Sequence, residues 1–204
     1  MAAATASRLS LWDSTLGLYD RVGSQCLQGA GIVRATIETL NQMQADGVIA
    51  HYAIGGAVGA TFYLEPAATL DVDVFVLLSN PGTALVSLTP VYEYLKARGG
   101  IEDREHIVLG DWPVQFLVPS NELEREAVAA SVPVDVEGVR TWVMLAEHLV
   151  AIALSTGRAK DHIRVLQFID EKAVDLQMLQ AILKNHGLLS KWQQFDHKFL
   201  EGRG

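Results

Sequence analysis

Apolar residues recur along the chain with two different spacings. Residues 29–46 carry them at helical spacing, which predicts an amphipathic helix, and residues 8–28 are expected to be helical as well. The short apolar segment 49–54 predicts a strand, and 57–64 predicts a helix that ends before Pro66. Residues 69–78 are rich in β-branched side chains and predict a further strand.

The second half of the chain changes from strands to helices. Turn residues and apolar patterning predict a helix at 91–100, two strands within 105–119 around a Gly110-Asp111 turn, a helix at 121–130 with Asn121 as its N-cap, and two short strands within 132–143. From Leu145 onward the pattern is helical. These elements predict an α+β fold, with a helix-flanked sheet domain over residues 1–145 and a C-terminal helical subdomain over 146–204.

Composition narrows the class of protein. The 204 residues are 50% hydrophobic and carry a formal net charge of -8, which describes a folded globular chain and argues against binding large nucleic acids through a basic face. Cys26 is the single cysteine, so neither a disulfide framework nor a cysteine-based zinc site is expected. No secretory signal or membrane-length apolar run is recognised, so we expect a cytoplasmic protein without membrane contact.

Two carboxylates begin the strand predicted at 69–78. Asp71 and Asp73 lie two residues apart, so they share one face, with Cα atoms about 6.6 Å apart from two strand rises of ~3.3 Å. This separation suits two carboxylates that converge on Mg²⁺. The alternative is that both are solvated residues at the start of a strand, or that they cap a neighbouring loop. The six histidines show no metal-ligand spacing that would compete with this pair.

A glycine pair precedes the carboxylates. Gly55 and Gly56 follow the strand predicted at 49–54, and their lack of Cβ atoms allows the backbone to approach a ligand closely. A glycine pair that leads into a helix presents N–H groups to phosphate, although for the pair alone a plain strand-to-helix turn is the favoured explanation. In the predicted order of elements, this pair and the two carboxylates meet at one edge of the sheet.

This set of features resembles the nucleotidyltransferase superfamily, whose members have a palm domain of the DNA-polymerase-β type. The residues that carry the resemblance are "GG" at 55–56 and "TLDVD" at 69–73, followed downstream by "GRAKD" at 157–161. The resemblance covers roughly residues 50–170 and is greatest to the minimal branch of abortive-infection toxins, the AbiEii-like proteins. It implies a mixed sheet flanked by helices, with a C-terminal helical bundle.

The resemblance also implies a function. Asp71 and Asp73 would hold Mg²⁺ or Mn²⁺, and a nucleoside monophosphate would move from a nucleoside triphosphate to a protein, a small molecule or an RNA end. Nucleotide-binding residues would be Gly55, Gly56, Thr69 and Arg158. Lys160 and Asp161 are the further catalytic candidates.

Two positions depart from the family pattern. Gln115 stands where many active members carry a third carboxylate, and an amide cannot serve as a general base. Asp111 and Asp135 are alternative candidates for that role. Ala153 occupies a position where active relatives often carry lysine. These departures support a second hypothesis, a catalytically impaired module that binds a nucleotide or acts in a toxin–antitoxin-type pair, as a homo-oligomer or with a cognate partner protein.

Overall fold

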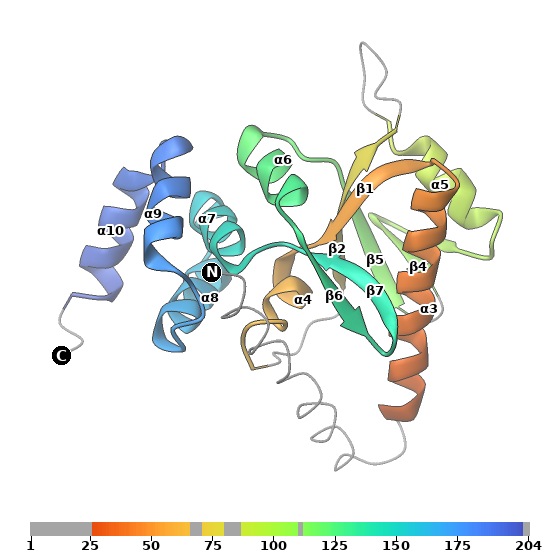
Figure 1. Ribbon diagram of the computed structural model, residues 1–204, viewed down its shortest axis with the longest axis horizontal. Coiled ribbons are helices and arrows are strands. Elements are labelled where there is room, and N and C mark those ends of the chain that lie inside the picture. Colours follow the sequence, from red (N-terminus) through yellow and green to blue (C-terminus); the bar gives the residue numbers. More distant parts are fainter. Residues whose placement is uncertain (1–25, 66–70, 80–86, 110–111, 202–204) are drawn as a thin grey trace.

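The computed structural model describes residues 26–65, 71–79, 87–109 and 112–201, which form seven strands and eight helices (Figure 1). The strands are β1 (Ile49–Ile54), β2 (Val72–Leu78), β3 (Ile101–Asp103), β4 (His106–Leu109), β5 (Trp112–Leu117), β6 (Val132–Val136) and β7 (Val139–Val143). The helices are α3 (Cys26–Ala45), α4 (Gly56–Ala60), α5 (Thr89–Lys96), α6 (Glu122–Ala129), α7 (Ala146–Thr156), α8 (Ala159–Asp170), α9 (Leu176–Asn185) and α10 (Leu189–Phe199).

All seven strands belong to one mixed sheet in the order β3-β4-β5-β2-β1-β7-β6. The central strand β2 runs antiparallel to β1 and parallel to β5, and β1 is parallel to β7 on its other side. The hairpins β4–β5 and β6–β7 complete the two halves of the sheet. The predicted α+β class, a mixed sheet flanked by helices with a helical C-terminal part, is therefore confirmed.

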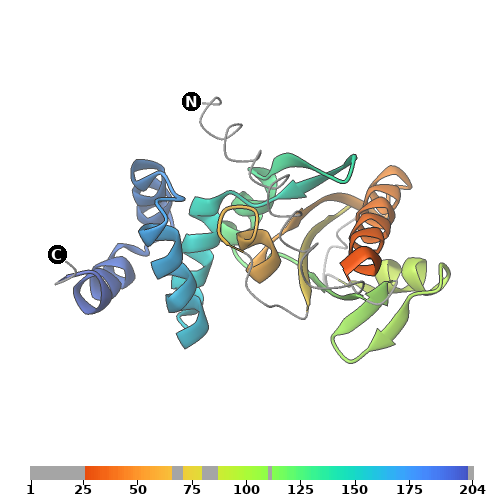
Figure 2. The same cartoon turned by 90° about the horizontal axis from the view of Figure 1, so that it is seen from below.

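The two faces of β2 bury different cores. Val72, Val74 and Val76 pack in one core with side chains of α3 and α5. Phe75 points to the opposite face and packs with side chains of α6 and α7. Figure 2 shows the sheet between α3 on one side and the C-terminal helices on the other. Since β2 is apolar on both faces after its first residues, it lies inside the sheet.

Several predicted elements differ in extent. The helix expected over 57–64 is the single turn α4, which ends where the Thr61 hydroxyl donates to the Val58 carbonyl oxygen at 2.7 Å. The strand β3 was not predicted, because three exposed residues carry no apolar alternation. The predicted N-cap is confirmed, since the Asn121 side chain accepts a hydrogen bond from the Glu124 N–H.

The C-terminal helices share one core with the sheet. Helix α7 is buried along most of its length, and its apolar side chains join those of α8, α9 and α10 in the same core as Phe75. The division into two domains at residue 145 stays a prediction. The helix expected over 8–28 falls almost entirely outside the described residues. None of the helices in the described ranges combines the length and the apolar character needed to cross a bilayer.

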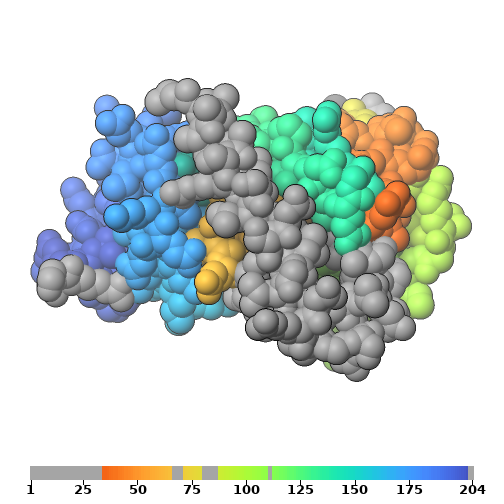
Figure 3. Space-filling model, turned by 60° about the horizontal axis from the view of Figure 1, so that its bottom comes forward, coloured from red at the N-terminus to blue at the C-terminus, as the bar shows by residue number. Residues whose placement is uncertain are grey.

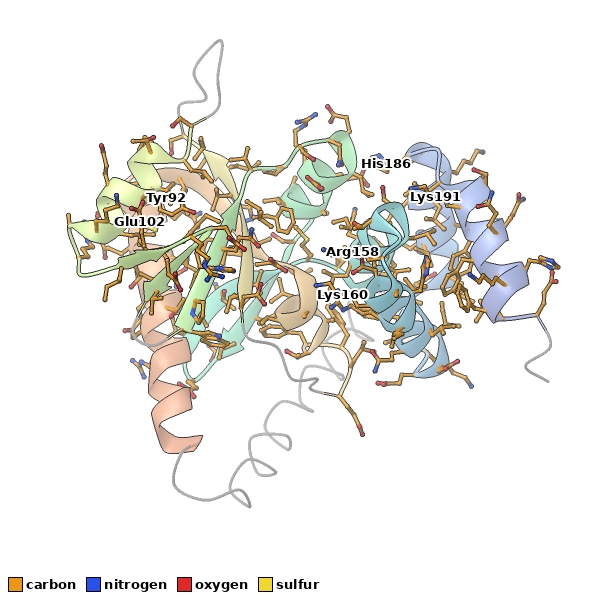
Figure 4. The ribbon with its side chains drawn as sticks, turned by 180° about the vertical axis from the view of Figure 1, so that it is seen from behind. Tyr92, Glu102, Arg158, Lys160, His186 and Lys191 are labelled. Atoms are coloured by element: carbon orange, nitrogen blue, oxygen red, sulfur yellow. The ribbon has the colours of Figure 1, made fainter. Side chains whose placement is uncertain are left out.

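A cluster of titratable side chains links α6 to the C-terminal helices. The Nε2–H of His148 on α7 donates to Oε1 of Glu126 on α6 at 3.2 Å, and the Nε2–H of His186, just after α9, donates to Oε2 at 2.7 Å. His148 is only 1% exposed. Figure 4 shows His186 next to α6 at the top of the helical part. We call Glu126, His148 and His186 the histidine clamp.

Candidate functional site

The strand β2 places both carboxylates at one edge of the sheet. Asp71 lies directly before β2 and Asp73 is its second residue, on the same face as Phe75. Asp73 is half-buried, and Phe75 is buried behind it. The shared face that the sequence predicts for the two aspartates follows from the alternation along β2. Their face is therefore polar at the start of the strand and apolar afterwards.

The glycine pair lies against Asp73. The Gly55 N–H donates to the Asp73 carbonyl oxygen at 2.9 Å, which extends the β1–β2 ladder by one residue. A Cβ on Gly56 would fall 1.8 Å from Oδ2 of Asp73, and the φ angle of Gly56 is 57°. Both facts require glycine at position 56. Figure 3 shows the segment around α4 at the surface, bordered by the C-terminal helices.

Strand β5 adds an amide to the same face. In the parallel β2–β5 pair, Asp73 lies directly opposite Gln115, so their side chains share a face. The position at which the sequence places an amide instead of a third carboxylate is therefore adjacent to Asp73. The alternative candidate Asp135 is exposed on β6, at the far end of the sheet, where its Oδ1 accepts the Gly138 N–H. Asp111 and Thr69 lie outside the described residues.

Strand β4 adds a histidine that the sequence reasoning missed. His106 Nε2 lies 3.6 Å from Oδ2 of Asp71. The register of the β4–β5 hairpin pairs Ile107 with Val114, so one step further His106 lies opposite Gln115. A usable signal was present in the sequence, because a hairpin centred on the predicted Gly110-Asp111 turn pairs positions 106 and 115.

The start of helix α8 carries a set of charged residues. Arg158 donates from Nε to Oδ2 of Asp161 at 2.7 Å and from Nη2 to Oδ1 at 3.3 Å. Arg164, one turn later, brings Nη1 to 3.6 Å from Oδ1 of the same carboxylate. Asp161 is 1% exposed, so its charge is neutralised between two guanidinium groups. Lys160 is exposed and, among the described residues, has no ion-pair partner within 4.0 Å.

Electrostatics connects α8 to β2. Burial and the neighbouring Asp71 carboxylate raise the pKa of Asp73, while the positive charges of Arg164, Lys160 and Arg158 act to lower it. Hydrogen bonding to Asp161 raises the pKa of Arg158, and the charge of Asp73 contributes to this. Figure 4 shows Arg158 and Lys160 on the side of α8 that faces the sheet. The site thus combines two carboxylates at the start of β2 with cations from the start of α8 that act on Asp73.

The donor set at this edge suits a hard divalent cation. Within the described residues, no three His, Cys, Asp or Glu side chains are grouped as a complete metal cage. Mg²⁺ is bound in proteins by one or two carboxylates, with substrate phosphates and water supplying the other oxygens. Asp71 and Asp73 provide such a pair, and the space beside Gly56 that a Cβ would fill is occupied by a carboxylate oxygen of Asp73.

Ala153 lies in the protein interior. It is buried in α7 within the core that joins the C-terminal helices. The resemblance suggests that active relatives often have lysine there. In this chain the cations that act on Asp73 come from α8 instead.

Comparison with known proteins identifies the fold. By sequence, the chain matches no protein-family model and no curated protein. The crystal structure of an antigenic nucleotidyltransferase-like protein from Paracoccidioides brasiliensis superimposes with a TM-score of 0.50 at 14% identity, covering 80% of this chain and 93% of that one. The solution structure of the antibiotic-resistance factor ANT(2'')-Ia gives a TM-score of 0.47 at 10% identity, covering 81% of this chain and 96% of that one. The first likeness shows that this chain has a nucleotidyltransferase-like fold.

Proposed function

We propose that this protein is a nucleotidyltransferase that uses Mg²⁺ or Mn²⁺ to transfer a nucleoside monophosphate from a nucleoside triphosphate to an acceptor hydroxyl, with release of pyrophosphate and the hydroxyl proton. One observation carries the proposal: Asp71 and Asp73 lie together at the start of β2, where Gly56 packs against Asp73 and three cations from the start of α8 act on Asp73. The nucleotidyltransferase-like fold supports it.

The proposed roles follow from charge. Asp71 and Asp73 would hold the divalent cation, which supplies charge neutralisation to the phosphates and activates an attacking hydroxyl when it is bound. Lys160 and Arg158 would bind the negatively charged triphosphate, Lys160 as a point charge and Arg158 through its planar guanidinium. Phosphoryl-transfer chemistry depends mainly on such positioning and neutralisation.

We assign Asp161 a supporting role within this proposal. Its carboxylate is buried and hydrogen-bonded to Arg158, with Arg164 at 3.6 Å, so it is not placed to bind a cation of its own. A carboxylate held in this way fixes the direction of the two guanidinium groups. Gly55 and Gly56 keep the backbone close to Asp73, and in this proposal the same backbone lies along the nucleotide phosphates.

The acceptor class stays broad in this proposal. A protein, a small molecule or an RNA end each presents a hydroxyl group that fits the reaction. The net charge of -8 makes an extended nucleic acid a poor partner, because phosphate backbones are attracted by cationic surfaces.

Gln115 favours a second candidate function. It lies directly opposite Asp73, at the position where a general base could accept the proton of the attacking hydroxyl. The amide of Gln115 cannot accept that proton. The same site would then bind a nucleotide without transferring it, as a sensor or as one half of a toxin–antitoxin-type pair, in a homo-oligomer or with a cognate partner protein.

Label transfer tests the proposal and separates the two functions. The full chain is incubated with each α-labelled nucleoside triphosphate, with Mg²⁺ or Mn²⁺, and with cell extract as the source of acceptors. We expect one nucleotide to label an acceptor, and Asp73→Ala to abolish the labelling. Asp135→Asn is the matched control, because that exposed carboxylate lies at the far end of the sheet and should leave transfer unchanged.

Two results would contradict the proposed enzyme. Labelling that persists in Asp73→Ala would place the chemistry elsewhere. Nucleotide binding without labelling of any acceptor would favour the binding module. Binding itself is measured by thermal unfolding, since a ligand at 100 times its Kd stabilises the folded state by about 2.7 kcal/mol.

A further inference from the structure

His106 has a buried nitrogen without a partner next to the candidate site. Its Nε2 is shielded from solvent and has no hydrogen-bond partner among the described residues. The side chain as a whole is 21% exposed, and the same Nε2 lies 3.6 Å from Oδ2 of Asp71. A buried donor or acceptor without a hydrogen-bond partner costs about 1–3 kcal/mol of folding free energy, so a hydrogen bond to this nitrogen is favourable.

The sheet holds His106 in this place. The next residue, Ile107, is fully buried and pairs with Val114 on β5. On the other side His106 pairs with Asp103 of β3. Strands β3, β4 and β5 therefore fix the backbone of His106. Its imidazole lies on the same face of the sheet as Gln115 and Asp73.

We propose that His106 is a positioning residue for Asp71. Once a divalent cation is bound, the Nε2–H of His106 would donate to Oδ2 of Asp71 and hold that carboxylate in the orientation that binds the cation. This inference rests on the proposed function, because it assigns Asp71 to a cation. Carboxylates that bind metals are themselves hydrogen-bonded by neighbouring groups, and the loss of such a group costs about 10–100-fold in metal affinity.

The geometry favours a positioning role over direct coordination. Among the described residues, His106 does not group with Asp71 and Asp73 as a set of three metal ligands, and its Nε2 faces Oδ2 of Asp71 instead. A separation of 3.6 Å is slightly long for a hydrogen bond, and such contacts at active sites often shorten only when the ligand is present.

Mn²⁺ binding to the full chain without nucleotide tests this inference. Free and bound Mn²⁺ are distinguished by electron paramagnetic resonance during a titration of the wild type, His106→Ala and His106→Gln. We expect His106→Ala to weaken binding by about 10–100-fold. His106→Gln should recover most of the loss, because the glutamine amide donates from a similar position. His197→Ala is the control, since His197 is exposed on α10.

The outcomes separate this inference from the proposed function. If His106→Ala binds Mn²⁺ as the wild type does while Asp73→Ala loses binding, the role of His106 is overturned and the metal site stands. If both His106 variants lose binding equally, donation by an N–H group is overturned. If the wild type binds no Mn²⁺, or Asp71→Ala and Asp73→Ala retain it, the proposed metal site itself fails. Thermal unfolding of each variant confirms that it is folded.

Discussion

Two carboxylates of this protein, Asp73 and Glu126, have opposite electrostatic surroundings. Burial and the like charge of Asp71 raise the pKa of Asp73. Hydrogen bonds from His186 and His148 hold the pKa of Glu126 below its usual range. Glu126 has both of its oxygens occupied by imidazole donors, at 3.2 and 2.7 Å.

The contrast separates a structural carboxylate from a functional candidate. At Glu126 two imidazole donors stabilise the charge, so the histidine clamp adds to the connection between α6, α7 and α9. At Asp73 the compensation from Arg158, Lys160 and Arg164 is incomplete, since the pKa is still raised. A bound divalent cation would complete it. Functional sites commonly combine such perturbed groups with a cost in stability.

The largest effect is expected at the contact between Gly56 and Asp73. In Gly56→Ala the new Cβ would fall 1.8 Å from Oδ2 of Asp73, so the carboxylate must move. A displacement of about 1 Å at a reacting site costs about 100-fold in rate, and we expect label transfer to fall by at least that factor. The measurement is transfer per amount of folded protein, with folding followed by circular dichroism.

Gly187 provides the matched control for that substitution. Its φ of 67° is close to the 57° of Gly56, yet no atom lies within 4 Å of its ideal Cβ. Gly187→Ala therefore carries the same kind of backbone strain without the contact. Equal activities of the two variants would show that the Gly56 contact with Asp73 has no role in transfer.

The next largest effect concerns the histidine clamp. Glu126→Ala removes the acceptor of His148, which is 1% exposed, and leaves its Nε2–H unpaired in the protein interior. A buried unpaired group costs about 1–3 kcal/mol, and we expect the free energy of unfolding in urea to fall by this amount.

Glu122 on the same helix is the control for Glu126. It forms an exposed ion pair with Arg125, a kind of contact that contributes about 0–1 kcal/mol. If Glu122→Ala and Glu126→Ala destabilise the protein equally, the clamp contributes no more than a surface pair.

Features that depend on local spacing along the chain could be predicted from the sequence. The shared face of Asp71 and Asp73 follows from strand alternation, and the N-cap at Asn121 follows from helix chemistry. The ion pair of Arg164 with Asp161 spans three residues of one helix and was also within reach of local spacing. This ion pair was not predicted, because the candidate residues that the resemblance implies for this helix come from the segment "GRAKD" at 157–161, which ends before Arg164.

Contacts between distant segments were beyond such reasoning. Glu126 meets His148 and His186 across 22 and 60 positions, and their pairing depends on how α6, α7 and α9 pack. The approach of His106 to Asp71 requires two pairings at once, β4 with β5 and β5 with β2. The hairpin is predictable from its turn, whereas the parallel pairing is not, because no short connection determines its register.

A smaller effect is expected on stability at Asp73. Since the raised pKa means that the folded state holds this proton more tightly than the unfolded chain does, ionisation of Asp73 at neutral pH destabilises the fold. Without divalent cations at pH 7, Asp73→Asn should therefore raise Tm. The gain should shrink as the pH falls and vanish below the ordinary value of 3.8, where the folded and the unfolded wild type both hold the proton.

Mn²⁺ should reverse the order of the Tm values of the wild type and Asp73→Asn. It should raise the Tm of the wild type and leave Asp73→Asn unchanged, while Asp135→Asn should follow the wild type under both conditions. A lower Tm for Asp73→Asn in the absence of metal would mean that the charge of Asp73 is already compensated, as that of Glu126 is.

The smallest expected effect is the response of the clamp to acid. Burial lowers the pKa of His148 below its ordinary 6.5, although the charges of Glu126 and Glu147 oppose this and that of His186 acts with it. A proton on Nδ1 would be a buried donor with no partner among the described residues. The unfolded chain therefore takes up this proton more readily below pH 6.5, and the free energy of unfolding must fall as the pH decreases through that range.

His148→Gln isolates this contribution. The glutamine amide still donates to Glu126 but does not titrate, so the variant should lose less stability than the wild type between pH 6.5 and 5. The opposite sign is expected at the exposed His197, where a hydrogen bond to Glu201 raises the pKa and the stabilisation fades as the pH rises. Urea unfolding at several pH values measures both slopes. Parallel curves for the wild type and His148→Gln would mean that the buried imidazole takes up a proton without a cost in stability. The charge of Glu126 would then not be compensated by neutral donors alone, and the contrast with Asp73 would fail.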